Sequence, residues 1–164
     1  MVHHDDTTRI VSVQDHYPDD VAHCFGCGRL NEAGYQLKSV WNGTEAVARF
    51  TPAAHHTSLP GFVYGGLIAS LVDCHAMATA AAGAGHADGR EPGSRPAPRF
   101  VTAALHVDYL RPTPLGPELE LRGRVAEQNG RKAIVDVTVA AAGDVTVRGR
   151  VVAVRMPDAM RRSP

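Results

Sequence analysis

The sequence lacks three features that would assign it to a broad class of proteins. Its 164 residues carry 17 Lys and Arg against 17 Asp and Glu, so no net charge attracts nucleic acid or an anionic membrane. Its three cysteines are too few, and odd in number, for a disulfide scaffold, and they suit a reducing compartment. Residues 1–20 are acidic and lack the apolar segment typical of a secretory signal. We therefore expect a cytoplasmic protein that binds neither nucleic acid nor membrane.

The length suits one domain with a proper core and is too short for two. Residues 1–20 are polar with weak periodicity, which predicts an N-terminal arm. Residues 21–156 form the predicted domain, and residues 157–164 form a C-terminal tail.

One long apolar stretch, residues 61–83, dominates the chain. Between Leu67 and Ala82 it consists mainly of Ala, Leu, Ile, Val and Met, with Asp73 as its one charged residue. This composition predicts a helix, and Gly83 predicts its end. A helix that is apolar on nearly every face is buried in a core. The central carboxylate and the polar flanks argue against a membrane span.

Alternating apolar and polar residues predict the strands, which lie on both sides of this helix. Asn42-Gly43 and Asn129-Gly130 predict hairpin turns, and short turns of this kind require antiparallel pairing. A helix that is apolar all round can be buried only if the sheet curls around it. The predicted fold is therefore α+β, with one long buried helix wrapped by a curved antiparallel sheet of about six strands. The expected strands are residues 35–41, 45–50, 99–110, 118–127, 132–141 and 145–154.

The order of these elements and several motifs resemble the hotdog-fold acyl-CoA thioesterases, in particular their phenylacetate-pathway-like branch. The motifs are CFGCGRLN, WNGTEAVARFTP with His56 after it, YGGLIASLVD, VDYLRPTPLG and NGRKA, and they cover roughly residues 23–155. In that branch the helix opens with His-Gly-Gly and carries an Asp nine residues after the His. Tyr64-Gly65-Gly66 and Asp73 keep this spacing, but Tyr64 replaces the His. Ser58 stands where many members have an Asn.

The residues at the start of the helix suit thioester hydrolysis. A helix N-terminus offers free N–H groups and a positive dipole end, and glycine lets a carbonyl approach the backbone. This assigns the Gly66 N–H as oxyanion donor, with Gly65 shaping the turn. Asp73 could attack the acyl carbon or activate a water, and the sequence leaves both roles open.

The spacing of these groups predicts a dimer. Gly65 and Asp73 are eight residues apart, which is about 12 Å along a helix axis. One small carbonyl cannot lie close to both, so two subunits would have to share each site across a two-fold axis. The resemblance implies the same homodimer, alone or as a dimer of dimers.

The resemblance also implies roles for residues outside the helix. Thr102 falls where a Ser or Thr supports the nucleophilic water, although an ordinary strand Thr would look the same. Turn cations are suited to the phosphates of coenzyme A, although solvated turn cations would show the same pattern. The candidate substrate-binding residues are Tyr64, His56, Ser58, Arg111, Arg131 and Lys132.

The remaining candidates predict no metal and no cofactor. Cys24 and Cys27, with His23 adjacent, suggest zinc, but a structural zinc site needs four ligands and no second ligand pair exists. Packing of a Gly-rich turn accounts for the pair better. His75 lies about 200° around the helix from Asp73, which predicts a core histidine.

Two functions remain open. The first is an acyl-CoA thioesterase, which hydrolyses a thioester to a free acid and CoA. The alternative is a non-catalytic acyl-CoA-binding hotdog protein, which Tyr64 and Ser58 favour because both depart from the usual residues. A hotdog hydratase needs a differently spaced Asp/His pair, which the sequence lacks.

Overall fold

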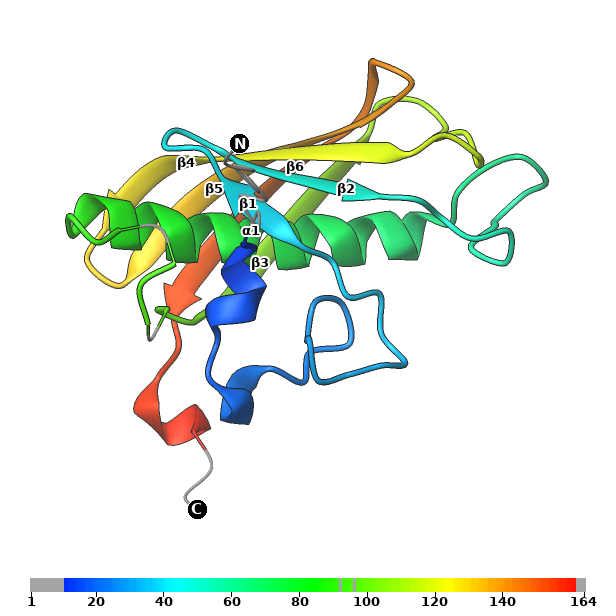
Figure 1. Ribbon diagram of the computed structural model, residues 1–164. Coiled ribbons are helices and arrows are strands. Elements are labelled where there is room, and N and C mark those ends of the chain that lie inside the picture. The colour runs from blue at the N-terminus through cyan, green and yellow to red at the C-terminus, as the bar shows by residue number, and fades with distance from the viewer. Residues whose placement is uncertain (1–10, 92, 96, 162–164) are drawn as a thin grey trace, which may run out of the picture.

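A long helix lies along the concave face of a single antiparallel sheet in the computed structural model, which describes residues 11–91, 93–95 and 97–161 (Figure 1). The helix, α1, spans Gly65–Ala87. The sheet has six strands in the order β1-β2-β4-β5-β6-β3. This confirms the predicted fold class. The strands are β1 (Ser39–Trp41), β2 (Ala46–Phe50), β3 (Phe100–Tyr109), β4 (Leu119–Asn129), β5 (Lys132–Ala141) and β6 (Asp144–Arg155).

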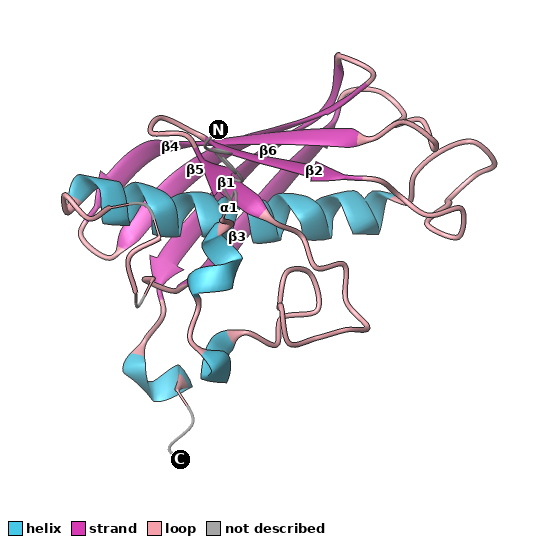
Figure 2. Cartoon of the chain, in the orientation of Figure 1, coloured by secondary structure: helices cyan, strands magenta, loops and turns pink. Residues whose placement is uncertain are grey.

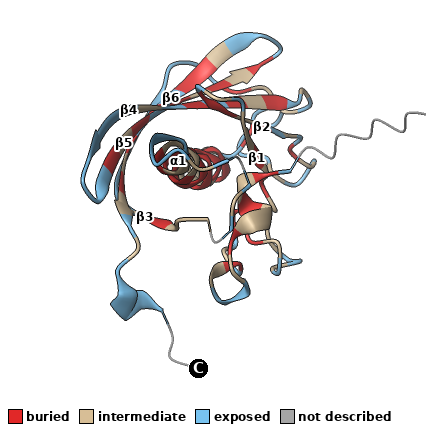
Figure 3. Ribbon diagram, turned by 60° about the vertical axis from the view of Figure 1, so that its left-hand side comes forward, coloured by how far each residue is buried: buried red, intermediate tan, exposed pale blue. Residues whose placement is uncertain are grey.

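The core lies between α1 and the concave face of the sheet, where buried residues from both meet (Figure 3). Leu71 and Val72 of the helix are fully buried, as are Leu121 of β4 and Val135 of β5. Burying one such side chain stabilises a fold by about 1.5–3 kcal/mol. The helix is long and apolar enough to cross a membrane, but 72% of its most apolar 18-residue window is buried inside the protein. Most of its apolar surface is therefore covered by the sheet and by other parts of the chain.

The prediction that Gly83 ends the helix is wrong, because α1 continues to Ala87 and has Asp88 at its C-cap. Gly83 is a packing residue. A Cβ atom there would lie 2.6 Å from Cγ2 of Val125 on β4. The missing side chain allows the last turns of the helix to approach the sheet closely.

The first strand is shorter than predicted, because only residues 39–41 of the expected 35–41 are strand. The backbone before it pairs with the loop that contains the cysteines. The Tyr35 N–H donates to the Phe25 carbonyl at 2.9 Å, and the Leu37 N–H donates to the Gly26 carbonyl at 3.0 Å. Short-range partners in the loop therefore replace a sheet partner for these residues. The other strands agree with prediction to within two residues.

Short 3₁₀ helices, η1 (Val13–His16), η2 (Asp19–Val21) and η3 (Asp158–Met160), lie outside the sheet (Figure 2). Residues 1–10 of the predicted arm and residues 162–164 of the predicted tail lie outside the described residues. η1 is packed against the domain: Gln14 is buried, and its amide oxygen accepts a hydrogen bond from the Ser39 N–H at 2.8 Å.

His75 is the core histidine that the sequence predicts. It is fully buried, with Nδ1 2.8 Å from the Ser39 hydroxyl and Nε2 3.1 Å from the Ala46 carbonyl oxygen. Burial lowers its pKa to about 4, so the ring is neutral at pH 7. A neutral ring that accepts from Ser39 and donates to Ala46 satisfies both partners, and it links α1 to β1 and β2.

Strand β3 forms one edge of the sheet, next to β6. Residues 102–106 in its middle are all exposed, although the strand is ten residues long. Long exposed edges are rare in stable monomers because they offer unpaired backbone groups to other chains. The edge of β3, together with the adjoining face of α1, is therefore a surface suited to pairing with another chain.

Candidate active site

One face of α1 is only partly covered within the chain. Gly66, Ala69, Ser70 and Asp73 are half-buried, while Leu67, Ile68, Leu71 and Val72 between them are buried. The four share one side of the helix, because residues three, four and seven apart lie above one another. Gly66 and Asp73 are separated by about 10 Å along the axis. Both predicted catalytic groups therefore open onto the same surface, but at different heights.

Asp73 is held by Thr102 of β3, whose hydroxyl donates to Asp73 Oδ1. The two residues that the sequence singled out are thus in direct contact. Partial burial raises the pKa of Asp73, and the hydrogen bond from Thr102 acts in the opposite direction. The carboxylate is accordingly more basic than one in water, yet has a donor that favours its ionised form.

A register shift in β3 positions Thr102. Thr102 pairs with Ala153 and Ala104 pairs with Val152, so Ala103 between them forms a bulge. Bulges re-aim neighbouring side chains and often lie next to functional sites. No residue pattern in the sequence signals this bulge.

The N-terminus of α1 carries the predicted oxyanion donor. Tyr64 occupies the N-cap position, but its side chain makes no capping hydrogen bond. The Tyr64 side chain therefore does not occupy the N–H groups of the first turn. The Tyr64 ring, which is exposed, covers the Cα of Gly66: a Cβ on that glycine would lie 2.5 Å from the ring. Tyr109 of β3 donates its hydroxyl to the Gly65 carbonyl at 2.6 Å. Tyr109 was not predicted as a site residue. Its position in the family-like motif VDYLRPTPLG is the sequence feature that could have indicated it.

His56 lies in the loop before α1 and lines a cavity of about 490 Å³. Its Nδ1 accepts from the Ala53 N–H at 2.9 Å, and its ring stacks on Phe50. Burial and the neighbouring His55 lower the pKa of His56. The carbonyl of His56 accepts from the Tyr64 N–H at 2.9 Å, which ties this loop to the start of the helix. The other lining residues are Phe25, Ala33, Gly34, Tyr35, Phe50 and His55.

The remaining substrate-binding candidates are exposed and scattered. Ser58 is an exposed loop residue. The Arg111 N–H donates to the Thr146 carbonyl, while Lys132 pairs with Val154 at the other end of β6. Eight residues of strand separate those two positions, a distance of about 26 Å. Within one chain, Arg111 therefore cannot share a phosphate with Lys132 or with Arg131 beside it.

The sequence and fold have known relatives. Residues 60–148 match the family model of the Thioesterase superfamily. Acyl-coenzyme A thioesterase THEM4 of Rattus norvegicus is 28% identical over 116 residues, covering 70% of this chain and 44% of that protein. The chain thus spans less than half the length of the curated relatives it matches.

Two solved structures are similar in fold. A Thioesterase superfamily protein from Shewanella loihica is 49% identical, with a TM-score of 0.60 over 75% of this chain and 93% of that one. The E. coli PaaI protein of the phenylacetic acid degradation operon is 20% identical, with a TM-score of 0.59 over 74% of this chain and 78% of that one. At that identity PaaI shares the fold alone, so the branch stays a prediction. The family match covers more than half of the chain and agrees with the hotdog architecture: this chain belongs to the thioesterase superfamily.

Proposed function

We propose that the chain is an acyl-CoA thioesterase, in which water cleaves the thioester to a free acid and CoA. One observation carries the proposal: Asp73, held by Thr102, and Gly66 at the helix N-terminus open onto one surface of α1. Membership of the superfamily supports thioester chemistry, and the name of the rat relative supports an acyl-CoA substrate.

The two groups supply complementary parts of the reaction. As the acyl carbon becomes tetrahedral, charge develops on its oxygen, and the Gly66 N–H with the helix dipole stabilises it. An ionised Asp73 can take a proton from water or attack the carbon itself. Thr102 supports either role, because its hydrogen bond favours the ionised form.

Each site is proposed to combine Gly66 of one subunit with Asp73 of the partner, in a homodimer or a dimer of dimers. Helix α1 contacts β3 at two levels: Gly65 with Tyr109, and Asp73 with Thr102. If two β3 edges paired antiparallel, the Tyr109 end of one would meet the Thr102 end of the other. Gly66 would then approach the partner's Asp73. The same pairing would bring Arg111 near the partner's Arg131 and Lys132.

A heterodimer of two inactive chains tests this arrangement. Asp73→Asn removes the carboxylate, and Gly66→Ala forces a Cβ atom against the Tyr64 ring, which must shift at the oxyanion position. The two variants are co-expressed with different tags and the heterodimer is purified through both. We expect one of its two sites to contain both intact groups, so that acyl-CoA turnover, measured by thiol release, recovers to about half of wild type.

The homodimers of each variant serve as controls and are expected to be nearly inactive. A heterodimer as inactive as both would rule out a shared site. A wild-type dimer that binds acyl-CoAs but releases no thiol from any of them would instead favour a binding protein. The three free cysteines support a reducing cytoplasmic location, which we include in the proposal.

A further inference from the structure

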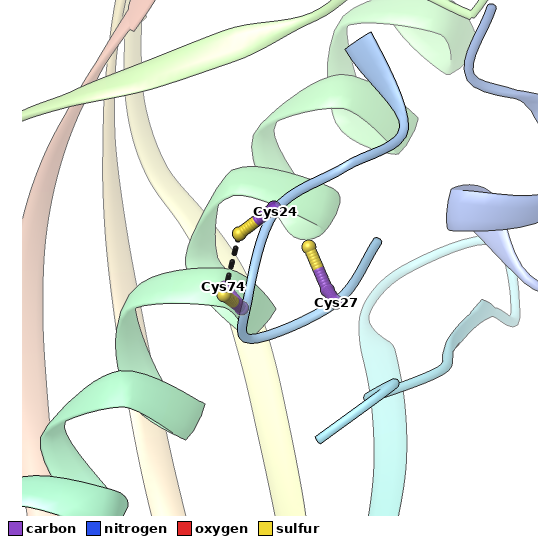
Figure 4. Close-up of side chains that lie close together, drawn as sticks. All are labelled: Cys24, Cys27 and Cys74. Atoms are coloured by element: carbon purple, nitrogen blue, oxygen red, sulfur yellow. Dashed lines mark hydrogen bonds between the residues drawn. The ribbon is translucent and has the colours of Figure 1, made fainter. Parts of the chain in front are cut away.

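Three cysteine side chains meet on the covered side of α1, outside the proposed catalytic groups (Figure 4). Cys24 and Cys27 come from the loop before β1, and Cys74 comes from the helix. Their sulfur atoms all lie within 4.8 Å of one another, and Sγ of Cys24 is 3.7 Å from Sγ of Cys74. From Cys24 and Cys27 alone, the sequence predicted no metal site. The fold adds a ligand from 47 residues further along the chain.

The loop has the local geometry of a metal-binding turn. In Cys24-Phe25-Gly26-Cys27-Gly28, two cysteines three residues apart lie in one tight turn. The Gly28 N–H closes the turn on the Cys24 carbonyl at 2.7 Å. A turn that holds two cysteines three residues apart can present both sulfurs to one ion, a spacing common in thiolate metal sites.

Glycine at two positions allows the loop to reach the helix. A Cβ on Gly26 would lie 2.3 Å from Sγ of Cys74, and one on Gly28 would lie 2.5 Å from the Cys24 nitrogen. Any side chain at these positions would push the loop away from the third sulfur or open the turn. The backbone is thus shaped to keep the three sulfurs together.

A positive charge lies close to the cluster. The Arg99 guanidinium, half-buried and stacked 4.5 Å above the Tyr17 ring, interacts electrostatically with all three cysteines. Three thiolates and one divalent ion carry a net charge of −1, which a guanidinium offsets. Buried charge of this kind is tolerated only when it is paired.

From this geometry we infer a thiolate metal site that holds one Zn²⁺ ion with Cys24, Cys27 and Cys74. Zinc–sulfur bonds of about 2.3 Å place the sulfurs of a tetrahedral site about 3.8 Å apart, which Cys24 and Cys74 already match. Water fills the fourth position, reached from the half-exposed side of Cys24. With three protein ligands and a water this is an open site, unlike the closed four-ligand structural site sought from the sequence. The ion links the loop to the helix turn that bears Asp73.

A disulfide and simple apolar packing are the two alternatives to zinc for this cluster. A disulfide would join two of the sulfurs. It would not account for the third thiol beside them or for the positive charge of Arg99 near the cluster. Simple packing does not require three sulfurs from the loop and the helix to converge on one point. Only the zinc site predicts that the reduced protein binds a thiophilic ion through all three sulfurs.

Cobalt provides the direct test, because Co²⁺ occupies zinc sites and thiolate ligands give it intense near-ultraviolet charge-transfer absorption. The full-length protein is reduced, stripped with a chelator and titrated with Co²⁺ without oxygen. We expect the absorption to saturate at one Co²⁺ per chain, to vanish when Zn²⁺ is added, and to weaken strongly in Cys74→Ser. Zn²⁺ should also raise the melting temperature of wild type.

His23→Ala is the matched control, because His23 is exposed and only its backbone carbonyl is engaged, by Asn31. It should bind Co²⁺ like wild type. Wild type without charge-transfer absorption, despite three titratable thiols per chain, would overturn the site, as would an unchanged spectrum in folded Cys74→Ser. If circular dichroism finds Cys74→Ser unfolded, folded Cys24→Ser decides by the same criterion.

Discussion

Asp73 is a partly buried carboxylate that accepts a hydrogen bond from the neutral hydroxyl of Thr102. Burying such a charge without a cationic partner lowers the stability of the fold. Asp73→Asn keeps the shape and removes the charge. We expect acyl-CoA turnover to fall by about 10²–10⁴-fold, the range that general-base catalysis supplies, while the melting temperature stays equal or rises. Both are measured on one preparation. A lower melting temperature, with activity lost only in proportion to unfolding, would assign Asp73 to structure.

Thr102 is expected to tune the same carboxylate. Its hydrogen bond lowers a pKa that burial raises, so Thr102→Val should raise the pKa of Asp73 further. Because the reaction needs the ionised form, the acidic limb of the kcat/KM profile should move to higher pH. Thr102→Ser retains the hydroxyl and should restore the wild-type profile. Identical profiles for the Val and Ser variants would show that the hydrogen bond does not matter for the reaction.

At the level of elements, the exposed edge of β3 is the feature with the clearest consequence. Leu105, in the middle of the strand, is 42% exposed. In an antiparallel β3 pair it would lie close to the partner's Leu105, so Leu105→Lys would set two like charges against each other. We expect a monomer by light scattering, native helix content, and loss of turnover because both sites become incomplete.

Met160→Lys, at an exposed position on η3, is the control and should stay a dimer. A monomeric Leu105→Lys protein with full turnover would mean that one chain holds a complete site.

The elements themselves could largely be predicted from the sequence, because their signals are local. Alternation located the last three strands, the Asn42-Gly43 hairpin signal located the first two, and the apolar stretch located α1. The end of α1 was missed because Gly83 serves a contact with Val125, which only the fold reveals. The start of β1 was missed because Tyr35 and Leu37 bond to the cysteine loop.

The candidate site was predictable where residues lie on one helix and unpredictable where segments converge. The spacing of Gly66 and Asp73 sufficed to place both on α1, and the resemblance located Thr102. The bulge at Ala103, the bond from Tyr109 to Gly65 and the approach of Cys74 to Cys24 depend on tertiary packing. No pattern within one segment encodes them.

At the level of the whole molecule, α1 is covered by this chain on two sides and only partly covered on a third. The sheet covers one side, and η1 with the cysteine loop covers another (Figure 3). The third side bears Gly66 and Asp73, and it is the side that the proposed partner and substrate would occupy. In the proposed dimer the partner would cover this face, so assembly would contribute to stability as well as to catalysis.

The cysteine loop has a consequence for how this sequence can vary in evolution. Gly26, Gly28 and Gly34 all lie where a Cβ would come within 2.5 Å of other atoms, the last of them 2.1 Å from the Phe25 carbonyl oxygen. Loops normally accept substitutions and insertions more readily than strands. This loop instead has as little room for side chains as the crowded strand positions Gly123 and Gly149, where a Cβ would lie 2.3 and 2.4 Å from helix side chains. Lineages that keep this site should preserve the three glycines while the solvent-facing positions of the sheet diverge.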